Sequence, residues 1–341
     1  MKIKILIYGE GYWYGLGVPL KKAFESIGHD VNLFDWTKYL FRAKKANIVN
    51  RIFDRFLFAK VADKINNNFQ EYIKHNRYDL LLVLQGKHLY SETLQFAKEN
   101  CTNIANWNID DFYNPNVRTI DLDSFKYYDW IFSPRKHLFD EYTKRGAQRI
   151  ECINWFYYPE RQYPINVEAR EADKLGSDIA FIGTWSKYRE NILFKLEGLK
   201  LKVWGSSWHK AKKEFKNKFK LMYQEAWFEE MSKVINSTKM IVDVLTIENR
   251  DTTNLKNFQV PACGGFLLTQ RTNEILELFE EGKEVVCYSS TEELKSKCKH
   301  YLLHDADREK IASNAYKKVI NGRNTLLDRA MQISNIIKDH I

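Results

Sequence analysis

One local pattern occurs twice in this chain, at its start and again near residue 180. The first copy reads ILIYGEGYWYGLGVPLKKAF and the second IAFIGTWSKYRENILFKL. In each copy an apolar run leads into a glycine turn and then into a helical pattern, as at the opening of a parallel α/β sheet. Because that unit begins a domain, its repetition predicts two similar α/β domains with parallel sheets facing a central cleft. Ligands are expected at the carboxyl ends of the strands, toward that cleft.

Short apolar runs and helical patterns alternate through the rest of both halves. The sequence DLLLVL, for example, is nearly all apolar, as in a parallel strand that is buried on both faces. Strands are expected at 2–8, 31–34, 79–84, 103–107, 130–133, 178–182, 201–204, 240–245, 266–269 and 284–288. Helices are expected at 19–27, 92–99, 136–145, 188–196, 291–303, 307–319 and 325–337, the fifth with a capping box from Ser290 to Glu293. Residues 157–176, polar and carrying Pro159 and Pro164, are expected to connect the two domains.

Composition excludes several classes of protein. Hydrophobic residues make up 44% and charged residues 28% of the 341, which is typical of a folded globular chain and not of a disordered one. No apolar run approaches the 18 residues of a membrane span. The five cysteines form no CxxC pair, which argues against zinc and against a disulfide framework. Reduced thiols and a cytoplasmic location are therefore expected.

The net charge, 53 − 44 = +9, fits anionic partners such as nucleotide phosphates, acidic glycans, lipids or nucleic acids. Residues 38–60 concentrate this excess, with seven basic residues against Asp54 and with interleaved phenylalanines. One interpretation is a basic amphipathic helix in peripheral contact with an anionic membrane. The other, slightly favoured, is a solvated helix whose phenylalanines pack inward. The basic segment 210–220 lacks any recognised nucleic-acid motif, so no nucleic acid is expected as a partner.

The first glycine turn, residues 9–17, has its third glycine one residue too late for a dinucleotide fingerprint. Asp35, at the end of the next apolar run, stands where such a site would hold a ribose, so an NAD-dependent dehydrogenase is one alternative. A turn of this kind also lets backbone amides approach an anion or a hydroxyl-rich ligand. A tight turn from strand to helix explains the glycines equally well.

Further polar residues follow the expected strands of the first half. Asp110 and Asp111 come directly after an apolar run, where an α/β cleft places functional acids, although loop acids are equally common there. His88 is a lone histidine for which a structural role is expected. The D-x-D sequence Asp121-Leu-Asp123 suits Mg²⁺ or Mn²⁺, but Asp123 or Ser124 could equally cap a helix.

The most specific segment is NLKNFQVPACGGFLLT, residues 254–269. A short apolar helix runs into a pair of glycines, Gly264 and Gly265, and then into a strand; such glycines let backbone approach a ligand closely. The segment resembles the CgeB-like branch of the group 1 glycosyltransferases. The same family is matched by the opening Phe181-Ile-Gly183-Thr-Trp185 with Arg189, and by the acidic run that begins at Glu274. The resemblance covers about residues 178–319.

That resemblance implies a GT-B architecture of two Rossmann-like domains. An acceptor-side domain would span 1–164, joined by the C-terminal helix 325–341, and a nucleotide-sugar donor domain would span 173–324. The implied reaction moves a sugar from a nucleotide-sugar donor to a glycan, a lipid-linked molecule or another acceptor. Transfer would retain the anomeric configuration, with no essential metal and no cofactor.

The family also implies roles for individual residues. Where related enzymes hold the donor ribose with Glu, this chain has Gln259, and Lys256 stands where Arg is usual. This departure leaves a catalytically weak nucleotide- or glycan-binding relative as an alternative. The implied catalytic residues are Arg189, Lys256 and Asp251; those that bind the donor are Gly183, Thr184, Gln259, Gly264 and Gly265; and those on the acceptor side are Gly11, Tyr12, His88, Asp110 and Asp111.

Overall fold

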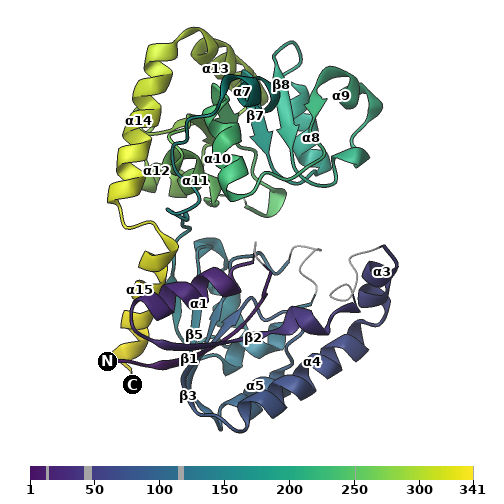
Figure 1. Ribbon diagram of the computed structural model, residues 1–341, viewed down its shortest axis with the longest axis vertical. Coiled ribbons are helices and arrows are strands. Elements are labelled where there is room, and N and C mark those ends of the chain that lie inside the picture. The colour runs from purple at the N-terminus through teal and green to yellow at the C-terminus, as the bar shows by residue number, and fades with distance from the viewer. Residues whose placement is uncertain (13–14, 42–47, 114–118, 250, 341) are drawn as a thin grey trace. The chain divides into compact units, whose positions relative to one another are not determined.

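The computed structural model describes residues 1–341 except 13–14, 42–47, 114–118, 250 and 341 (Figure 1). The chain divides into two compact units. Unit 1 consists of Met1–Asn154 and Leu326–Ile341, and unit 2 consists of Trp155–Thr325. The stretch 157–176, which the sequence suggested as a connection, lies within unit 2.

Unit 1 is built on a six-stranded sheet in which every neighbouring pair of strands is parallel. The order is β2 (Asp30–Asp35), β1 (Lys4–Gly9), β3 (Tyr78–Leu84), β4 (Cys101–Trp107), β5 (Trp130–Ser133) and β6 (Ile150–Cys152). All five strands that the sequence predicted here are present. The sixth is a three-residue edge strand, IEC, with no fully buried residue, and so it lacked the apolar signal of the others.

The helices of unit 1 are α1 (Gly17–Ser26), α3 (Ile48–Phe56), α4 (Phe58–Ile73), α5 (Ser91–Ala97), α6 (Phe139–Lys144) and α15 (Leu326–Lys338). The last of them comes from the C-terminal end of the chain and lies beside α1 (Figure 1). Its Ser334 Oγ is 2.7 Å from Nε2 of the buried His29. The C-terminal helix is therefore an integral part of the first unit.

Unit 2 has a second six-stranded, all-parallel sheet. Its order is β12 (Val286–Tyr288), β11 (Leu267–Gln270), β10 (Met240–Val242), β7 (Ile179–Ile182), β8 (Leu201–Trp204) and β9 (Lys220–Leu221). Its helices are α7 (Ala169–Leu175), α8 (Lys187–Phe194), α9 (Lys213–Lys218), α10 (Phe228–Asn236), α11 (Lys256–Ala262), α12 (Asn273–Leu278), α13 (Thr291–Leu303) and α14 (Asp305–Asn321). The expected α/β class with two parallel sheets is confirmed.

Burial explains why the central strands read as continuous apolar runs. In β7 the side chains of Ile179 and Phe181 pack into one core, while those of Ala180 and Ile182 pack into another on the opposite face of the sheet. Because helices cover both faces, no polar face remains along such a strand. No helix of the described residues is long and apolar enough to span a membrane.

The order of the strands fixes where ligands are expected in each unit. Chain order reverses between β1 and β3 in unit 1 and between β7 and β10 in unit 2. In doubly wound sheets the loops after the two strands at such a reversal diverge and leave a crevice at their carboxyl ends. The two reversal points are therefore the places to search for functional side chains.

Candidate functional site

Arg189, in the first turn of α8, spans the reversal point of unit 2. Its Nε donates to the carbonyl oxygen of Val244, which follows β10, at 2.9 Å. Its Nη1 donates to the carbonyl oxygen of Thr184, which follows β7, at 3.0 Å. The guanidinium lies over the ring of Phe181, and the residue is only 7% exposed. Arg189 thus joins the two diverging loops in addition to placing a positive charge between them.

A buried ion pair lies at the same edge of the sheet. The carboxyl of Asp243, directly after β10, is fully buried, and its Oδ1 is 3.2 Å from Nζ of Lys256 on α11. Burial lowers the pKa of Lys256 below its usual value, and the charge of Arg189 adds to this, while the carboxylate of Asp243 acts in the opposite direction. The two cations implied by the family resemblance, Arg189 and Lys256, therefore lie near each other in the fold.

Asp243 is also the centre of a hydrogen-bond network that sequence reasoning missed. Its Oδ2 accepts from Nδ2 of Asn254 at 2.7 Å and from Oγ1 of Thr269 at 3.3 Å. Oδ1 of the same Asn254 accepts from the backbone N–H of Lys256 at 2.7 Å. The network thereby fixes the start of α11 against β10. The available signal was an acid within the apolar run MIVDVL, because a buried carboxylate requires partners.

The glycine pair after α11 has structural reasons of its own. Gly264, with φ +74°, donates to the carbonyl oxygen of Pro261, and Gly265 donates to that of Val260, so the pair ends the helix. A Cβ on Gly265 would lie 2.3 Å from Cγ2 of Ile235 on α10. Close packing against α10 is therefore one reason for a glycine at this position.

Gln259 lies on α11, one turn beyond Lys256, and is half-buried. Within the described part of the chain its side chain makes no polar contact. Its amide group is therefore available to a ligand, which is what a residue that holds a ribose requires. The structure neither brings it into the Asp243 network nor gives it another role.

Gly183 and Thr184 form the turn after β7. The carbonyl oxygen of Gly183 accepts from Nε1 of Trp208 at 2.8 Å and would be only 2.1 Å from a Cβ on Gly205. The turns after β7 and β8 thus approach each other at backbone distance. The exposed hydroxyl of Thr184 lies 3.1 Å from that of Ser206, which places two hydroxyls at the carboxyl edge of the sheet.

Asp251 lines a separate pocket beside the reversal point. The pocket has a volume of about 300 Å³ and is lined by Tyr188, Leu245, Thr246, Ile247, Asp251, Gln270, Arg271 and Thr272. Gln270 organises it, because its Oε1 accepts from the N–H of Leu245 at 2.7 Å and its Nε2 donates to the hydroxyl of Tyr188 at 3.0 Å. The pocket offers a carboxylate, hydroxyls and an aromatic ring, groups that suit a hydroxyl-rich ligand.

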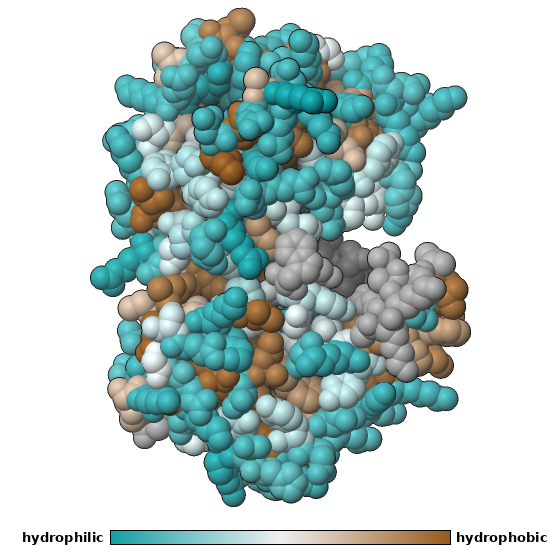
Figure 2. Space-filling view, viewed as in Figure 1, coloured by the Kyte–Doolittle hydropathy of each residue, from teal (hydrophilic) through white to brown (hydrophobic). Residues whose placement is uncertain are grey.

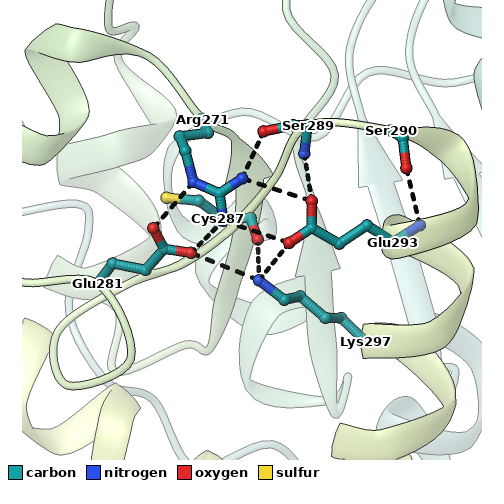
Figure 3. A network of polar contacts seen from close by, with 7 residues as sticks. All are labelled: Arg271, Glu281, Cys287, Ser289, Ser290, Glu293 and Lys297. Carbon is teal, nitrogen blue, oxygen red and sulfur yellow. Dashed lines mark hydrogen bonds and ion pairs between the residues drawn. The ribbon is translucent and has the colours of Figure 1, made fainter.

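The charge of Arg271 in this pocket is already balanced by two carboxylates (Figure 3). Its guanidinium pairs with Glu281 and Glu293, and Lys297 lies 2.8 Å from Glu293. Hydrogen bonds from Arg271, from Lys297 and from the backbone of Ser289 lower the pKa of Glu293 to about 2. This cluster ties the end of β11 to α13, and it makes Arg271 a structural cation.

Of the two hydrogen bonds expected for the capping box at the start of α13, one is present. Ser290 Oγ accepts from the N–H of Glu293 at 3.1 Å, but the Glu293 carboxylate accepts from the backbone N–H of Ser289.

In unit 1 the glycine turn after β1 folds against Asp35. The N–H of Gly11 donates to Oδ1 of Asp35 at 2.9 Å, and Thr37 donates to the same oxygen. A Cβ on Gly11 would lie 2.2 Å from Oδ2 of Asp35. Asp35 therefore holds the turn and caps the next helical turn, which explains both residues without a dinucleotide. Tyr12 belongs to the same turn, where its carbonyl oxygen accepts from Gly15 at 2.9 Å.

The two acids after β4 are held by different partners. Asp110 accepts from Nε2 of Gln85, which follows β3, at 2.6 Å, so it lies at the reversal point of unit 1. Asp111 is 3.7 Å from Nε2 of His137 and accepts from the N–H of Tyr113 at 2.8 Å. Burial alone would raise the pKa of Asp111, but its contacts with His137 and with the N–H of Tyr113, together with the charge of Arg135, lower it below its usual value. Asp111 is thus kept as a carboxylate at the strand end.

His88 follows β3 in the left-handed region, with φ +60°. Its ring packs against Trp36 and Phe58, with centroids 5.1 and 5.0 Å away, and the residue is 8% exposed. These contacts fit the structural role that was expected for a lone histidine.

The D-x-D sequence makes local contacts. Asp121, not Asp123 or Ser124, caps the following turn, and its Oδ2 accepts from Ser91. The described residues contain no group of three His, Cys, Asp or Glu arranged to hold a metal ion.

Comparison with known proteins places this geometry in context. No curated protein matches the chain significantly. Residues 189–335 match the family described as "Glycosyl transferase-like". The matched region begins at Arg189 and includes Asp243, Lys256 and Gln259. The CgeB-like branch that the sequence resembles is a narrower group than the family described by this match.

Solved structures resemble the whole chain in fold. HepE from Anabaena, in complex with UDP-glucose, is 11% identical with a TM-score of 0.65, over 99% of this chain and 100% of that one. Sucrose-phosphate synthase from Thermosynechococcus elongatus is 12% identical with a TM-score of 0.69, over 99% of both chains. A trehalose-6-phosphate synthase, studied for glycosyl transfer with retention, is 11% identical with a TM-score of 0.67, again over 99% of both. At these identities the likeness shows the fold alone. The family match over residues 189–335 identifies the protein as an enzyme of the glycosyltransferase class, on the GT-B fold that its sequence predicted.

Proposed function

We propose that the protein transfers a sugar from a nucleotide-sugar donor, bound by unit 2, to a glycan or lipid-linked acceptor. The observation that carries this proposal is the pair of cations at the reversal point of unit 2. Arg189 and Lys256 are both largely buried, and both lie at the strand ends where an α/β sheet binds nucleotides. HepE, which has the same fold, was solved with UDP-glucose. UDP-glucose is therefore the first donor to test.

Glycosyl transfer leaves a nucleoside diphosphate, on which negative charge develops as the sugar departs. Fixed positive groups in a site with little water stabilise that charge without reorganisation. Arg189 and Lys256 would supply them, so the reaction is proposed to need no metal. Asp251 and the hydroxyls of its pocket would contact the donor sugar, and Gln259 would contact the ribose. A retaining outcome is proposed by analogy with the trehalose-6-phosphate synthase of the same fold.

The narrower CgeB-like assignment rests on the segment 254–269 and its flanks. Acceptor contacts are proposed for unit 1, at its own reversal point, where Gly11, Tyr12 and Asp110 lie at strand ends. The five cysteines are all free thiols, which suits the cytoplasm. A lipid-linked acceptor would bring the enzyme to the inner face of a membrane.

The test is calorimetric titration with UDP-, GDP-, CDP-, ADP- and dTDP-sugars, followed by an assay of donor hydrolysis and transfer. Lys256→Met should abolish measurable donor binding. Lys195→Met, which removes an exposed charge from the end of α8, is the matched control and should bind like wild type. Failure of every nucleotide sugar to bind the wild-type protein contradicts the proposal.

Gln259 favours a second candidate, a catalytically weak nucleotide- or glycan-binding protein. An amide can hydrogen-bond a ribose diol but brings no charge. Tight donor binding without hydrolysis or transfer to any tested acceptor would support this candidate. Turnover with any acceptor would exclude it.

A further inference from the structure

Helix α3 turns an apolar face outward. Val49, Ile52, Phe53 and Phe56 are 49%, 46%, 44% and 80% exposed. Their spacing of i, i+3, i+4 and i+7 puts all four on one side of the helix. In the space-filling view, hydrophobic surface gathers over this helix at the right-hand margin (Figure 2). A helix normally packs such a face inward, so this arrangement requires an explanation.

The phenylalanines of the segment divide into two groups. Phe41 packs against the core of unit 1, and Phe58 lies against the buried ring of His88. Phe53 and Phe56, in contrast, are on the exposed face of α3, although the ring centroid of Phe53 also lies 5.9 Å from that of Phe41. The inward packing that the sequence slightly favoured is therefore correct for the first pair, partial for Phe53 and wrong for Phe56.

The segment that contains this helix is strongly basic in sequence. Residues 38–60 carry seven basic residues and one acidic residue, Asp54. That acid is engaged locally, because its Oδ1 accepts from the backbone N–H of Phe41 at 2.6 Å. Two of the basic residues, Arg51 and Arg55, belong to α3 itself and alternate with its apolar residues. An exposed apolar stripe within so basic a segment fits a lipid surface, whose headgroups are anionic and whose interior is apolar.

We infer that α3 binds the surface of an anionic lipid bilayer. Val49, Ile52, Phe53 and Phe56 would enter the boundary between headgroups and acyl chains, and the basic residues of 38–60 would contact lipid phosphates. Positive charge on this scale opposes pairing with a second copy of the same surface and favours an anionic partner. The inference extends the proposed function to a membrane-bound acceptor, but it does not depend on which donor unit 2 binds.

Flotation tests the inference with vesicles of phosphatidylcholine alone and of phosphatidylcholine mixed with phosphatidylglycerol. Wild type should float only with the mixed vesicles, less so as salt is raised. Ile52→Ser/Phe56→Ser should reduce vesicle binding by at least about tenfold. The matched control is Leu303→Ser, on α13 of unit 2, since Leu303 is 82% exposed and should not affect binding.

A second pair of variants separates charge from hydrophobic burial. Arg51→Gln/Arg55→Gln should weaken binding to the mixed vesicles by about tenfold. Lys213→Gln/Lys220→Gln removes the same charge from an exposed part of unit 2 and should leave binding unchanged. The inference is overturned if Ile52→Ser/Phe56→Ser binds vesicles like wild type. It is also overturned if the wild type binds no vesicles and sedimentation shows that it forms a dimer which Ile52→Ser/Phe56→Ser abolishes.

Donor titration distinguishes this inference from the proposed function. Ile52→Ser/Phe56→Ser should bind the donor like wild type, which also shows that the variant is folded. Vesicle binding by a wild type that binds no nucleotide sugar would support the membrane surface and contradict only the proposed reaction.

Discussion

Nζ of Lys256 lies 3.2 Å from Oδ1 of Asp243, and the two side chains differ in exposure. The lysine side chain is 15% exposed, whereas the carboxyl is fully buried behind it. The ammonium therefore lies at the carboxyl edge of the sheet, and the carboxylate stabilises it from within. Such an arrangement can hold a cation at a fixed position with a lowered desolvation cost.

The pair makes a prediction about stability. Lys256→Met leaves the buried carboxylate of Asp243 without its ion-pair partner, at a cost of about 3–5 kcal/mol at pH 8. Urea unfolding at that pH measures it. The double variant Asp243→Asn/Lys256→Met should be more stable than Lys256→Met at pH 8, and equal stabilities would show that the pair is not coupled.

Arg189 should matter to stability as well as to activity. Arg189→Ala should lower turnover, with a loss of about 2–4 kcal/mol of transition-state stabilisation. Because its guanidinium donates to the carbonyls of Thr184 and Val244, we now also expect a loss of about 1–3 kcal/mol in the free energy of unfolding. Unfolding in the absence of nucleotide, compared with donor turnover, measures both. Turnover near that of wild type would exclude Arg189 from the reaction.

The sequence predicted the fold well because parallel strands carry a strong local signal. DLLLVL and IAFI are buried on both faces, and each was located to within a residue or so. The strands that were missed, β6 and β9, have three and two residues, and each includes a residue outside the core. Such short edge strands are defined by their neighbour in the sheet, which a local pattern does not contain.

The site was predicted less completely, because its organising residues act through contacts distant in sequence. Asp243 was read as part of a strand, and only its approach to Lys256 and Asn254 shows that it is the centre of a network. Gly265 was assigned to ligand approach, and the structure adds a packing partner, Ile235, that lies thirty positions earlier along the chain. Residue types suggested the chemistry of the site, but they could not show which residues contact one another across the fold.

Glu293 should make the stability of unit 2 sensitive to acid. Its pKa falls from 4.5 to about 2 in the folded protein through hydrogen bonds from Arg271 and Lys297. A lowered pKa gives a contribution that is complete above 4.5 and is lost as the pH falls toward 2. Because the side chain is 30% exposed, we expect screening to limit the contribution to about 1–2 kcal/mol.

Urea unfolding of Glu293→Gln and wild type at pH 7 and pH 2.5 tests this. The variant should be less stable at pH 7, and the difference should become much smaller at the lower pH. Glu292→Gln, the neighbouring exposed acid, is the control and should cost less at pH 7. A difference that persists unchanged at pH 2.5 contradicts the assigned cause.

Gly265→Ala should destabilise the protein by overpacking. The added Cβ would lie 2.3 Å from Cγ2 of Ile235, which predicts a cost of about 1–3 kcal/mol. In an Ile235→Ala background the same substitution should cost much less, because the clashing atom is gone. Gly282→Ala is a useful comparison: it has φ +80° and nothing within 4 Å, so it should show only backbone strain of about 1 kcal/mol. Equal costs for Gly265→Ala in both backgrounds would exclude Ile235 as the cause.

Gln259 offers the cleanest test of donor recognition, because its side chain has no polar contact among the described residues. Gln259→Ala should therefore change the free energy of unfolding by less than about 0.5 kcal/mol. If the amide holds the donor ribose, the same substitution should weaken donor binding by about ten- to a hundredfold, since it leaves a hydroxyl unpaired. Calorimetric titration measures this loss separately from stability.

Gln259→Glu restores the residue that the related enzymes use. A carboxylate accepts from both ribose hydroxyls in stronger, charge-assisted bonds, but it also lies near a pyrophosphate of the same sign. With Arg189 and Lys256 at the same strand ends to offset that repulsion, donor affinity should stay within about tenfold of wild type or improve. The assignment requires Ala to bind the donor more weakly than Glu. If both variants bind like wild type while remaining equally stable, Gln259 does not contact the nucleotide, and the role assigned to this position from the related enzymes is wrong.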